Sequence, residues 1–232
     1  RRSPAESSVS TTKRGSIPAS MAWSRSSPAH QPWNVPIGAD SLAQLLRDDS
    51  RLSLMRAAAD KGGMTAMLGD AAQNLTLFAA ENDAFDALAQ RLGLGDGQGL
   101  LSALSADDWK SILQYALLPQ RRGLSSLQPS ATLDTLYQYG GDTMRLIFQT
   151  DGSGFFNVWD GFRLGIAVPR SNIAASNGVM HITSELVLPR GVLTVSQMLR
   201  ANVDYFSESS SQMTAQVIAE LDGPGPFTVF VP

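Results

Sequence analysis

The chain has 232 residues, of which 43% are hydrophobic, so it is long enough for one full domain of ~100 to 150 residues and part of another. Its 18 basic and 21 acidic residues are nearly balanced, which gives no broad electrostatic footprint for nucleic acid or for an anionic membrane. The absence of cysteine excludes disulfides, thiolate metal sites and cysteine nucleophiles, and no apolar run approaches the ~20 residues of a membrane span.

Residues 1–37 are rich in serine, proline and arginine and show neither a helical nor a strand period. Such a segment buries too little apolar surface to offset the entropy lost on ordering. It is basic, but a solvated linker is a simpler interpretation than a nucleic-acid arm. We therefore predict a disordered linker or tail. It carries no signal-peptide core, so we expect any export signal outside this sequence.

From Asp40 the spacing of apolar residues becomes helical. We predict that Asp40 caps a first short helix and that a second one ends at Gly62 and Gly63. The apolar positions of these helices are Leu42, Leu45, Leu46, Leu52, Met55 and Ala59. The apolar run 75–79 then predicts a buried strand, and Asn82 is the expected cap of a following helix that ends at Gly93. The glycine-rich residues 93–99 predict a flexible connection rather than a phosphate loop.

The strongest helical signal begins with a predicted capping box between Ser105 and Asp108. Apolar residues then recur at Trp109, Ile112, Leu113, Ala116 and Leu117. Acidic residues in the first turn complement the helix dipole, which is a simpler account of Asp107 and Asp108 than a metal site.

Beyond Pro119 the period falls to two. Alternation over 144–149 and over 162–168 predicts strands, the second of which follows a turn at Asp160 and Gly161. Asn177 and Gly178 predict a chain reversal at positive φ, which leads into a strand from Val179 and a further strand at 186–188 that Pro189 ends. Helices followed by a mainly antiparallel sheet indicate the α+β class.

Few residues are candidates for chemistry. The two histidines are His30 and His181, and no nucleophile elbow accompanies either. His181 lies in an apolar strand, so we expect a structural core residue, no enzyme and no cofactor. Asn74 begins a Asn-Leu-Thr sequon and is a candidate glycosylation site.

Two segments recur along the chain. Residues 44–47 are similar to 197–200, and residues 75–78 are similar to 227–230, at offsets of 153 and 152. Two segments sharing nearly one offset predict a tandem duplication with a period of one domain. We expect residues 191–232 to be the start of a second, incomplete copy.

Residues 75–85 and 177–189 together resemble the two ordered signature motifs of the fasciclin (FAS1) domain family. The matching motif positions are Leu77, Phe78, Asn82, Ala84, Phe85, Asn177, Gly178, Val179, His181, Leu188 and Pro189. The resemblance implies a fasciclin domain over 38–190, with a β-wedge or sandwich and N-terminal helices packed against the sheet.

The same resemblance implies a function. It suggests a non-catalytic module of a tandem fasciclin-domain protein that is secreted, at the cell surface or periplasmic. Such a module mediates cell adhesion or matrix contact through a protein or glycan partner and adjoins a neighbouring fasciclin domain. The alternatives are a hydrolase or a small-molecule carrier whose site lies partly outside this fragment. The candidate interaction positions are Tyr115, Asn172 and Ile173, although Asn172 replaces the aspartate of the integrin motif in adhesive animal relatives, and the histidine expected after Tyr115 is absent.

Overall fold

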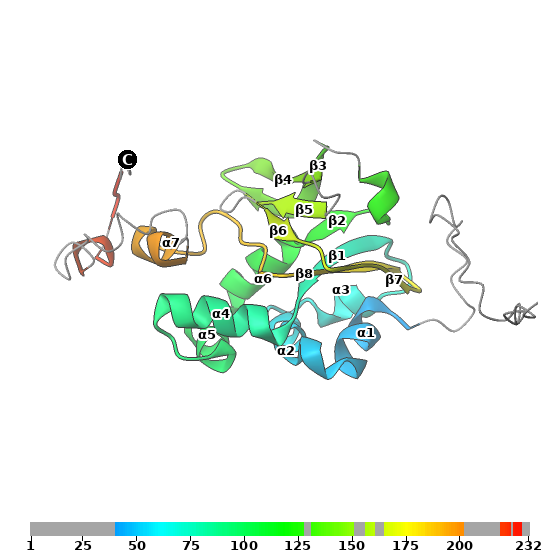
Figure 1. Ribbon diagram of the computed structural model, residues 1–232, viewed down its shortest axis with the longest axis horizontal. Coiled ribbons are helices and arrows are strands. Elements are labelled where there is room, and N and C mark those ends of the chain that lie inside the picture. The colour runs from blue at the N-terminus through cyan, green and yellow to red at the C-terminus, as the bar shows by residue number, and fades with distance from the viewer. Residues whose placement is uncertain are drawn as a thin grey trace, which may run out of the picture. The chain divides into compact units, whose positions relative to one another are not determined.

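The computed structural model describes residues 40–127, 131–150, 156–160, 165–201, 219–223 and 225–228 (Figure 1). All of these residues belong to one compact unit that spans 32–232. The linker predicted over residues 1–37 lies outside the described residues.

The helices gather mainly in the first half of the chain. They are α1 (Leu42–Asp48), α2 (Ser53–Lys61), α3 (Thr65–Gly69), α4 (Asn82–Leu92), α5 (Gly97–Ala103), α6 (Ala106–Tyr115) and α7 (Val195–Ala201), with short 3-10 turns at η2 (Ser50–Leu52) and η3 (Leu124–Ser126). Helices α3 and α5 were not predicted. Gly97 suggested a loop, yet it lies in α5, where an added Cβ would lie 2.9 Å from the Phe85 Cβ of α4. The close approach of these two helices therefore favours glycine there.

The strands in the described part of the chain form two four-stranded sheets. Sheet A has the order β2-β1-β8-β7, with β1 (Leu75–Ala80), β2 (Leu117–Pro119), β7 (Arg170–Ala175) and β8 (Gly178–Thr183). Sheet B has the order β3-β4-β5-β6, with β3 (Thr132–Tyr139), β4 (Asp142–Thr150), β5 (Phe156–Trp159) and β6 (Ile166–Ala167). Every pair is antiparallel except β1 and β8, which are parallel neighbours at the centre of sheet A. The prediction of an α+β fold is confirmed.

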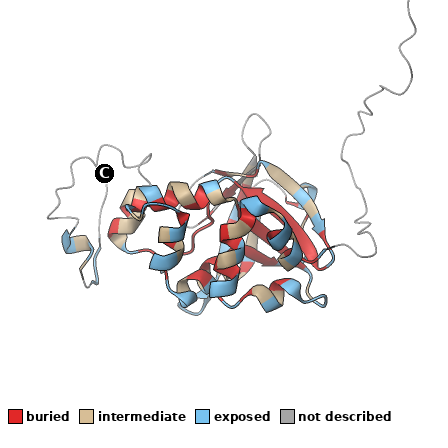
Figure 2. Cartoon of the chain, turned by 90° about the horizontal axis from the view of Figure 1, so that it is seen from below, coloured by how far each residue is buried: buried red, intermediate tan, exposed pale blue. Residues whose placement is uncertain are grey.

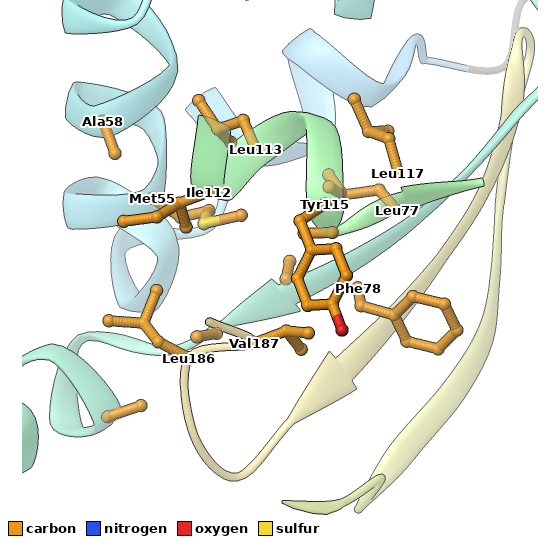
Figure 3. Packing of buried hydrophobic residues seen from close by; sticks show 14 of the residues in the cluster. Met55, Ala58, Leu77, Phe78, Ile112, Leu113, Tyr115, Leu117, Leu186 and Val187 are labelled. Atoms are coloured by element: carbon orange, nitrogen blue, oxygen red, sulfur yellow. The ribbon is translucent and has the colours of Figure 1, made fainter. Parts of the chain in front are cut away.

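Sheet A lies between the helices and sheet B (Figure 1). Every residue of β1 and of β8 is buried, as expected for central strands covered on both faces. On one face Phe78 packs against Phe148 of sheet B, with ring centroids 5.5 Å apart. On the other, Leu77 belongs to the core cluster that also contains residues of α2 and α6 (Figure 3). The helices accordingly alternate between buried and exposed residues along their length (Figure 2).

Two helix caps differ from the prediction. Ser41, not Asp40, caps α1, and its capping box with Gln44 shows both reciprocal hydrogen bonds. Glu81, not Asn82, is the N-cap of α4. In both cases the residue types alone did not distinguish two neighbouring candidates for the cap. The capping box predicted for α6 between Ser105 and Asp108 is confirmed.

The end of the domain also differs from the prediction. The reversal before β8 is at Ser176 and Asn177, and neither Asn177 nor Gly178 has positive φ. Residues 186–188 form no strand. They are buried in a segment without regular secondary structure, where Leu186 and Val187 lie in the core (Figure 3). The Leu188 N–H donates to Asp160 Oδ2 at 2.9 Å. Of the strand predicted over 162–168, the described part contains β6 at Ile166–Ala167, and residues 161–164 lie outside the described ranges.

Candidate functional site

The two signature segments meet at the centre of sheet A. Strand β1 pairs with β8 in a register that places Phe78 beside His181 and Thr76 beside Val179. Parallel register partners share a face of the sheet, so Thr76, Phe78 and His181 all face sheet B. Thr76 and His181 on this face hold the segment 120–124 through hydrogen bonds.

His181 has no exposed surface, and both of its ring nitrogens contact backbone groups. Nδ1 accepts from the Asn172 N–H at 3.2 Å, so the proton lies on Nε2, which donates to the Arg122 carbonyl at 2.8 Å. The ring stacks on Phe78, with centroids 5.3 Å apart. Burial lowers the pKa of His181 below its usual value, while the bond to Arg122 opposes that effect. The neutral ring is therefore a structural connector rather than a free base.

The segment 120–124 crosses this face of sheet A and is held there by residues of the motif. The hydroxyl of Thr76 donates to the Gln120 carbonyl at 2.7 Å and accepts from the Arg122 N–H at 2.8 Å. Both backbone groups of Arg122 are thus bound, one by Thr76 and the other by His181. The signature residues therefore fix where the Arg122 side chain leaves the chain.

The Arg122 guanidinium contacts Gln120, whose Oε1 accepts from Arg122 Nη2 at 2.8 Å. Among the described residues, Arg122 forms no ion pair. Gln120 has φ of 93°, which is uncommon for a residue with a side chain and costs on the order of 1 to 3 kcal/mol. No sequence motif pointed to Gln120 or Arg122, because their positions depend on contacts with β1 and β8.

A cleft of about 220 Å³ opens beside this arginine, between the end of β2 and the beginning of β3. It is lined by Leu118, Pro119, Gln120, Arg122, Thr132, Leu133 and Asp134. The Asp134 carboxylate is engaged by Arg145, whose Nε lies 2.6 Å from Oδ1. The uncompensated charge in the cleft is therefore the positive charge of Arg122. A second hollow of about 290 Å³ includes Thr143, Arg145 and Arg190.

Asn177 joins three elements from inside the fold. Its Oδ1 accepts from the Leu42 N–H at 2.9 Å, and its Nδ2 donates to the carbonyls of Leu68 and Asp70 at 2.8 and 3.0 Å. It is 1% exposed and satisfies backbone groups at the ends of α1 and α3. Gly178 follows it because a Cβ there would lie 2.3 Å from the Leu75 carbonyl oxygen.

The remaining motif positions are placed in the core or tie elements together. Leu77, Phe78, Ala84, Phe85, Val179, Leu188 and Pro189 are buried. Asn82 accepts from the Leu54 N–H at 3.0 Å and donates to the Ser50 carbonyl at 3.0 Å, so it connects α4 to the start of α2.

The three candidate interaction residues lie in different environments. Tyr115 is buried in the core and donates to the Arg145 carbonyl at 3.0 Å, so its ring gives a partner no access. Asn172 is exposed on β7 with φ of 60°, and its Oδ1 accepts from the Leu124 N–H at 2.8 Å. Ile173 is half-buried, and the sequon residue Asn74 is exposed just before β1. The structure does not bring the three candidate interaction residues and the sequon residue together in one site.

A surface ion network connects β7 to the helices. Arg170 forms an ion pair with Glu81, and Arg51 lies 2.7 Å from Asp49 and 3.7 Å from Glu81. The hydrogen bond from Arg51 lowers the pKa of Asp49. The positive charge of Arg170 is therefore balanced by Glu81. Pairs as exposed as these contribute only ~0 to 1 kcal/mol each.

Within the described ranges, no group of three histidine, aspartate or glutamate side chains is placed to hold a metal ion. No helix there is long and apolar enough to cross a membrane. The geometry of this site offers a fixed cation, exposed strand edges and backbone hydrogen-bonding groups, which suit recognition of another molecule.

Comparison with known proteins agrees with the fold. A sequence model of the Fasciclin domain matches residues 50–189, which is more than half of the chain. The chain belongs to the fasciclin domain family. This finding confirms the family resemblance of the two signature segments, both of which lie within the matched residues.

Nineteen chains of solved structures are similar to this fasciclin domain. One is a FAS1 domain pair from the insect cell adhesion molecule Fasciclin I, with a TM-score of 0.54 and 17% identity. The similarity covers 66% of this chain and 53% of that chain, so the fasciclin chain here spans about half of the domain pair. At this identity the likeness shows the fold alone. No curated protein matches the sequence.

Proposed function

We propose that the chain is a non-catalytic interaction module of a tandem fasciclin-domain protein, which mediates cell adhesion or matrix contact. The observation that carries this proposal is the bonding of His181, because both ring nitrogens bind backbone groups inside a fasciclin fold. A general base needs a ring nitrogen within reach of a substrate proton. The similarity to a domain pair of an adhesion molecule supports the same assignment.

The tandem arrangement is supported by a repeated helix cap. Ser41 and Gln44 form the capping box of α1, and Thr194 and Gln197 form the same reciprocal bonds before α7. The two boxes are separated by 153 residues, the offset of the sequence repeat. We therefore propose a first domain over 38–190 and the start of a second over 191–232. The neighbouring domain is a partner of the first, in keeping with the contact between α7 and α4.

The alternative functions are less well supported. A hydrolase would need His181, whose nitrogens are occupied. A small-molecule carrier usually holds its ligand in a pocket of ~300 to 1,000 Å³, and each of the two clefts described above, of about 220 and 290 Å³, is smaller than that. The exposed surface is the better candidate for function.

We place the module outside the cell, as a secreted, cell-surface or periplasmic domain. The exposed position of Asn74 supports its use as a glycosylation site in a host that glycosylates such sequons. Intact-mass measurement of the secreted protein before and after removal of N-linked glycans tests this assignment. An unchanged mass in the wild type would contradict it.

Attachment assays test the function. Cells from the source organism, or beads coated with its matrix, are applied to surfaces coated with the folded chain, with urea-unfolded chain or with albumin. We expect attachment to the folded chain only, because the binding surface is assembled from segments far apart in sequence. Equal attachment to the unfolded chain or none to the folded chain would contradict the proposal.

A further inference from the structure

Strand β3 is the edge of sheet B, and part of its backbone points toward the cleft. The Phe148 N–H donates to the Ala131 carbonyl at 3.0 Å, and Thr132 lies opposite Ile147. Because antiparallel partners alternate between bonded and non-bonded pairs, the N–H and C=O of Thr132 point away from β4. The same alternation directs those of Asp134 outward. Edge groups of this kind are a template for another extended chain.

The facing wall of the cleft is the end of β2, the edge of sheet A. Pro119 has no N–H to offer there, so at the cleft it presents only its ring and its carbonyl, which points away from β1. Leu118 and Leu133 add further apolar lining. A chain entering the cleft would therefore pair with β3 and pack its side chains against β2.

Arg122 gives the cleft its charge preference. Its backbone is bound by Thr76 and His181, and its guanidinium is oriented by Gln120. An arginine held in this way loses little freedom when it binds a carboxylate, and charge-assisted pairs are stronger than neutral ones. Gln120 adopts φ of 93° to hold this position, and such strain occurs often at binding sites.

We propose that this cleft binds an extended peptide segment of a partner protein, with its main chain paired to β3 at Thr132 and an acidic side chain bound by Arg122. This inference rests on the proposed function, since it names the class of partner. The volume of about 220 Å³ suits one or two residues of a peptide. The outward N–H and C=O groups of β3 favour a peptide over a glycan, because a peptide main chain matches the repeat of a strand.

The probe is an acetylated and amidated peptide with the sequence Thr-Val-Glu-Val-Thr, compared with a twin in which Gln replaces Glu. Amide chemical shifts of the full chain are followed by NMR during titration with each peptide. We expect shifts centred on Thr132 and Leu133 and an affinity about tenfold higher for the acidic peptide, the difference that a charged hydrogen bond commonly makes. Arg122→Gln should abolish that preference, while Arg56→Gln, which removes an exposed arginine on α2, should keep it.

A second variant separates binding from folding. Gln120→Gly removes the strain at positive φ and also the amide that orients Arg122. We expect a higher melting temperature together with severalfold weaker binding of the acidic peptide. A loss of stability in this variant, or unchanged binding, would argue against the role given to Gln120.

Other outcomes overturn the inference. They are equal affinity for the two peptides, shifts located away from β3, or stronger shifts at Thr132 with trigalacturonate than with the acidic peptide. Cell attachment to the folded chain together with no peptide binding would remove this inference and leave the proposed function. Peptide binding without attachment would remove the proposed function and leave the cleft.

Discussion

The Nε2 atom of His181 lies 2.8 Å from the backbone oxygen of Arg122, so a residue of the second signature motif fixes a loop 59 positions away. The opposite nitrogen of the ring binds the N–H of Asn172. This histidine therefore joins β8 to β7 and to the segment that carries the arginine. Its role is to position these parts of the surface.

Replacement of His181 by alanine should lower the free energy of unfolding by about 3 kcal/mol. The change leaves a cavity beside Phe78 and removes the partners of two backbone groups. Urea denaturation of the purified chain measures the effect, and His181→Gln, which can keep one of the bonds, should lose less. Wild-type stability in the alanine variant would contradict the structural role.

Protonation of His181 should destabilise the fold as the pH falls. Burial lowers its pKa in the folded chain, so the unfolded chain binds the proton more readily. The contribution of the neutral His181 ring to the free energy of unfolding is therefore fully present above the unfolded pKa of ~6.5. That contribution is lost as the pH falls from there through the folded pKa. Denaturation series from pH 8 to 5 in wild type and His181→Gln measure this. The slope assigned to His181 should vanish in the variant, and equal slopes in both proteins would refute the assignment.

Asn177 should be among the most sensitive polar residues of the chain. Alanine there removes the side-chain partners of the buried Leu42 N–H and Leu68 carbonyl and one of the two partners of the Asp70 carbonyl, which also accepts from the Gln73 N–H. We expect a loss of roughly 2 to 4 kcal/mol of unfolding free energy, since each unmet group costs ~1 to 3 kcal/mol. The matched control is Asn74→Ala, which changes an exposed asparagine and should shift stability by less than ~0.5 kcal/mol. Similar losses in both variants would contradict the account.

Patterns among neighbouring residues predicted the helices and strands that are determined by those neighbouring residues. Strand β1, the period of α6 and its capping box between Ser105 and Asp108 all follow from neighbouring residues. The family motif predicted a structural role for His181, which stays a prediction; the ring is buried, and both of its nitrogens bind backbone groups.

The features that the sequence did not predict depend on contacts between residues far apart in the chain. Asn82 was expected to cap α4, but its amide binds the start of α2. The dipeptide of Asn177 and Gly178 suggested a turn at positive φ, whereas the amide satisfies two helix ends and the glycine admits the Leu75 carbonyl. Arg122 and Gln120 belong to no sequence motif. They are candidates for binding because both line the cleft between β2 and β3.

The last prediction concerns the role of metal ions in adhesion. Asn172 stands where integrin-binding relatives carry an aspartate, and a neutral amide is a much weaker ligand for a divalent cation. Its Oδ1 accepts from the Leu124 N–H, and Arg170 is paired with Glu81. An aspartate introduced at position 172 would still face the Leu124 N–H. The chain is therefore expected to adhere without a metal-centred carboxylate.

The most direct measurement of this account is attachment of cells to immobilised folded chain with and without EDTA, for the wild type and for Asn172→Asp. Because recognition is assigned to the folded surface and not to a bridging cation, attachment to the wild type should persist unchanged in EDTA. Attachment to the wild type that EDTA removes and an anti-integrin antibody blocks would contradict it.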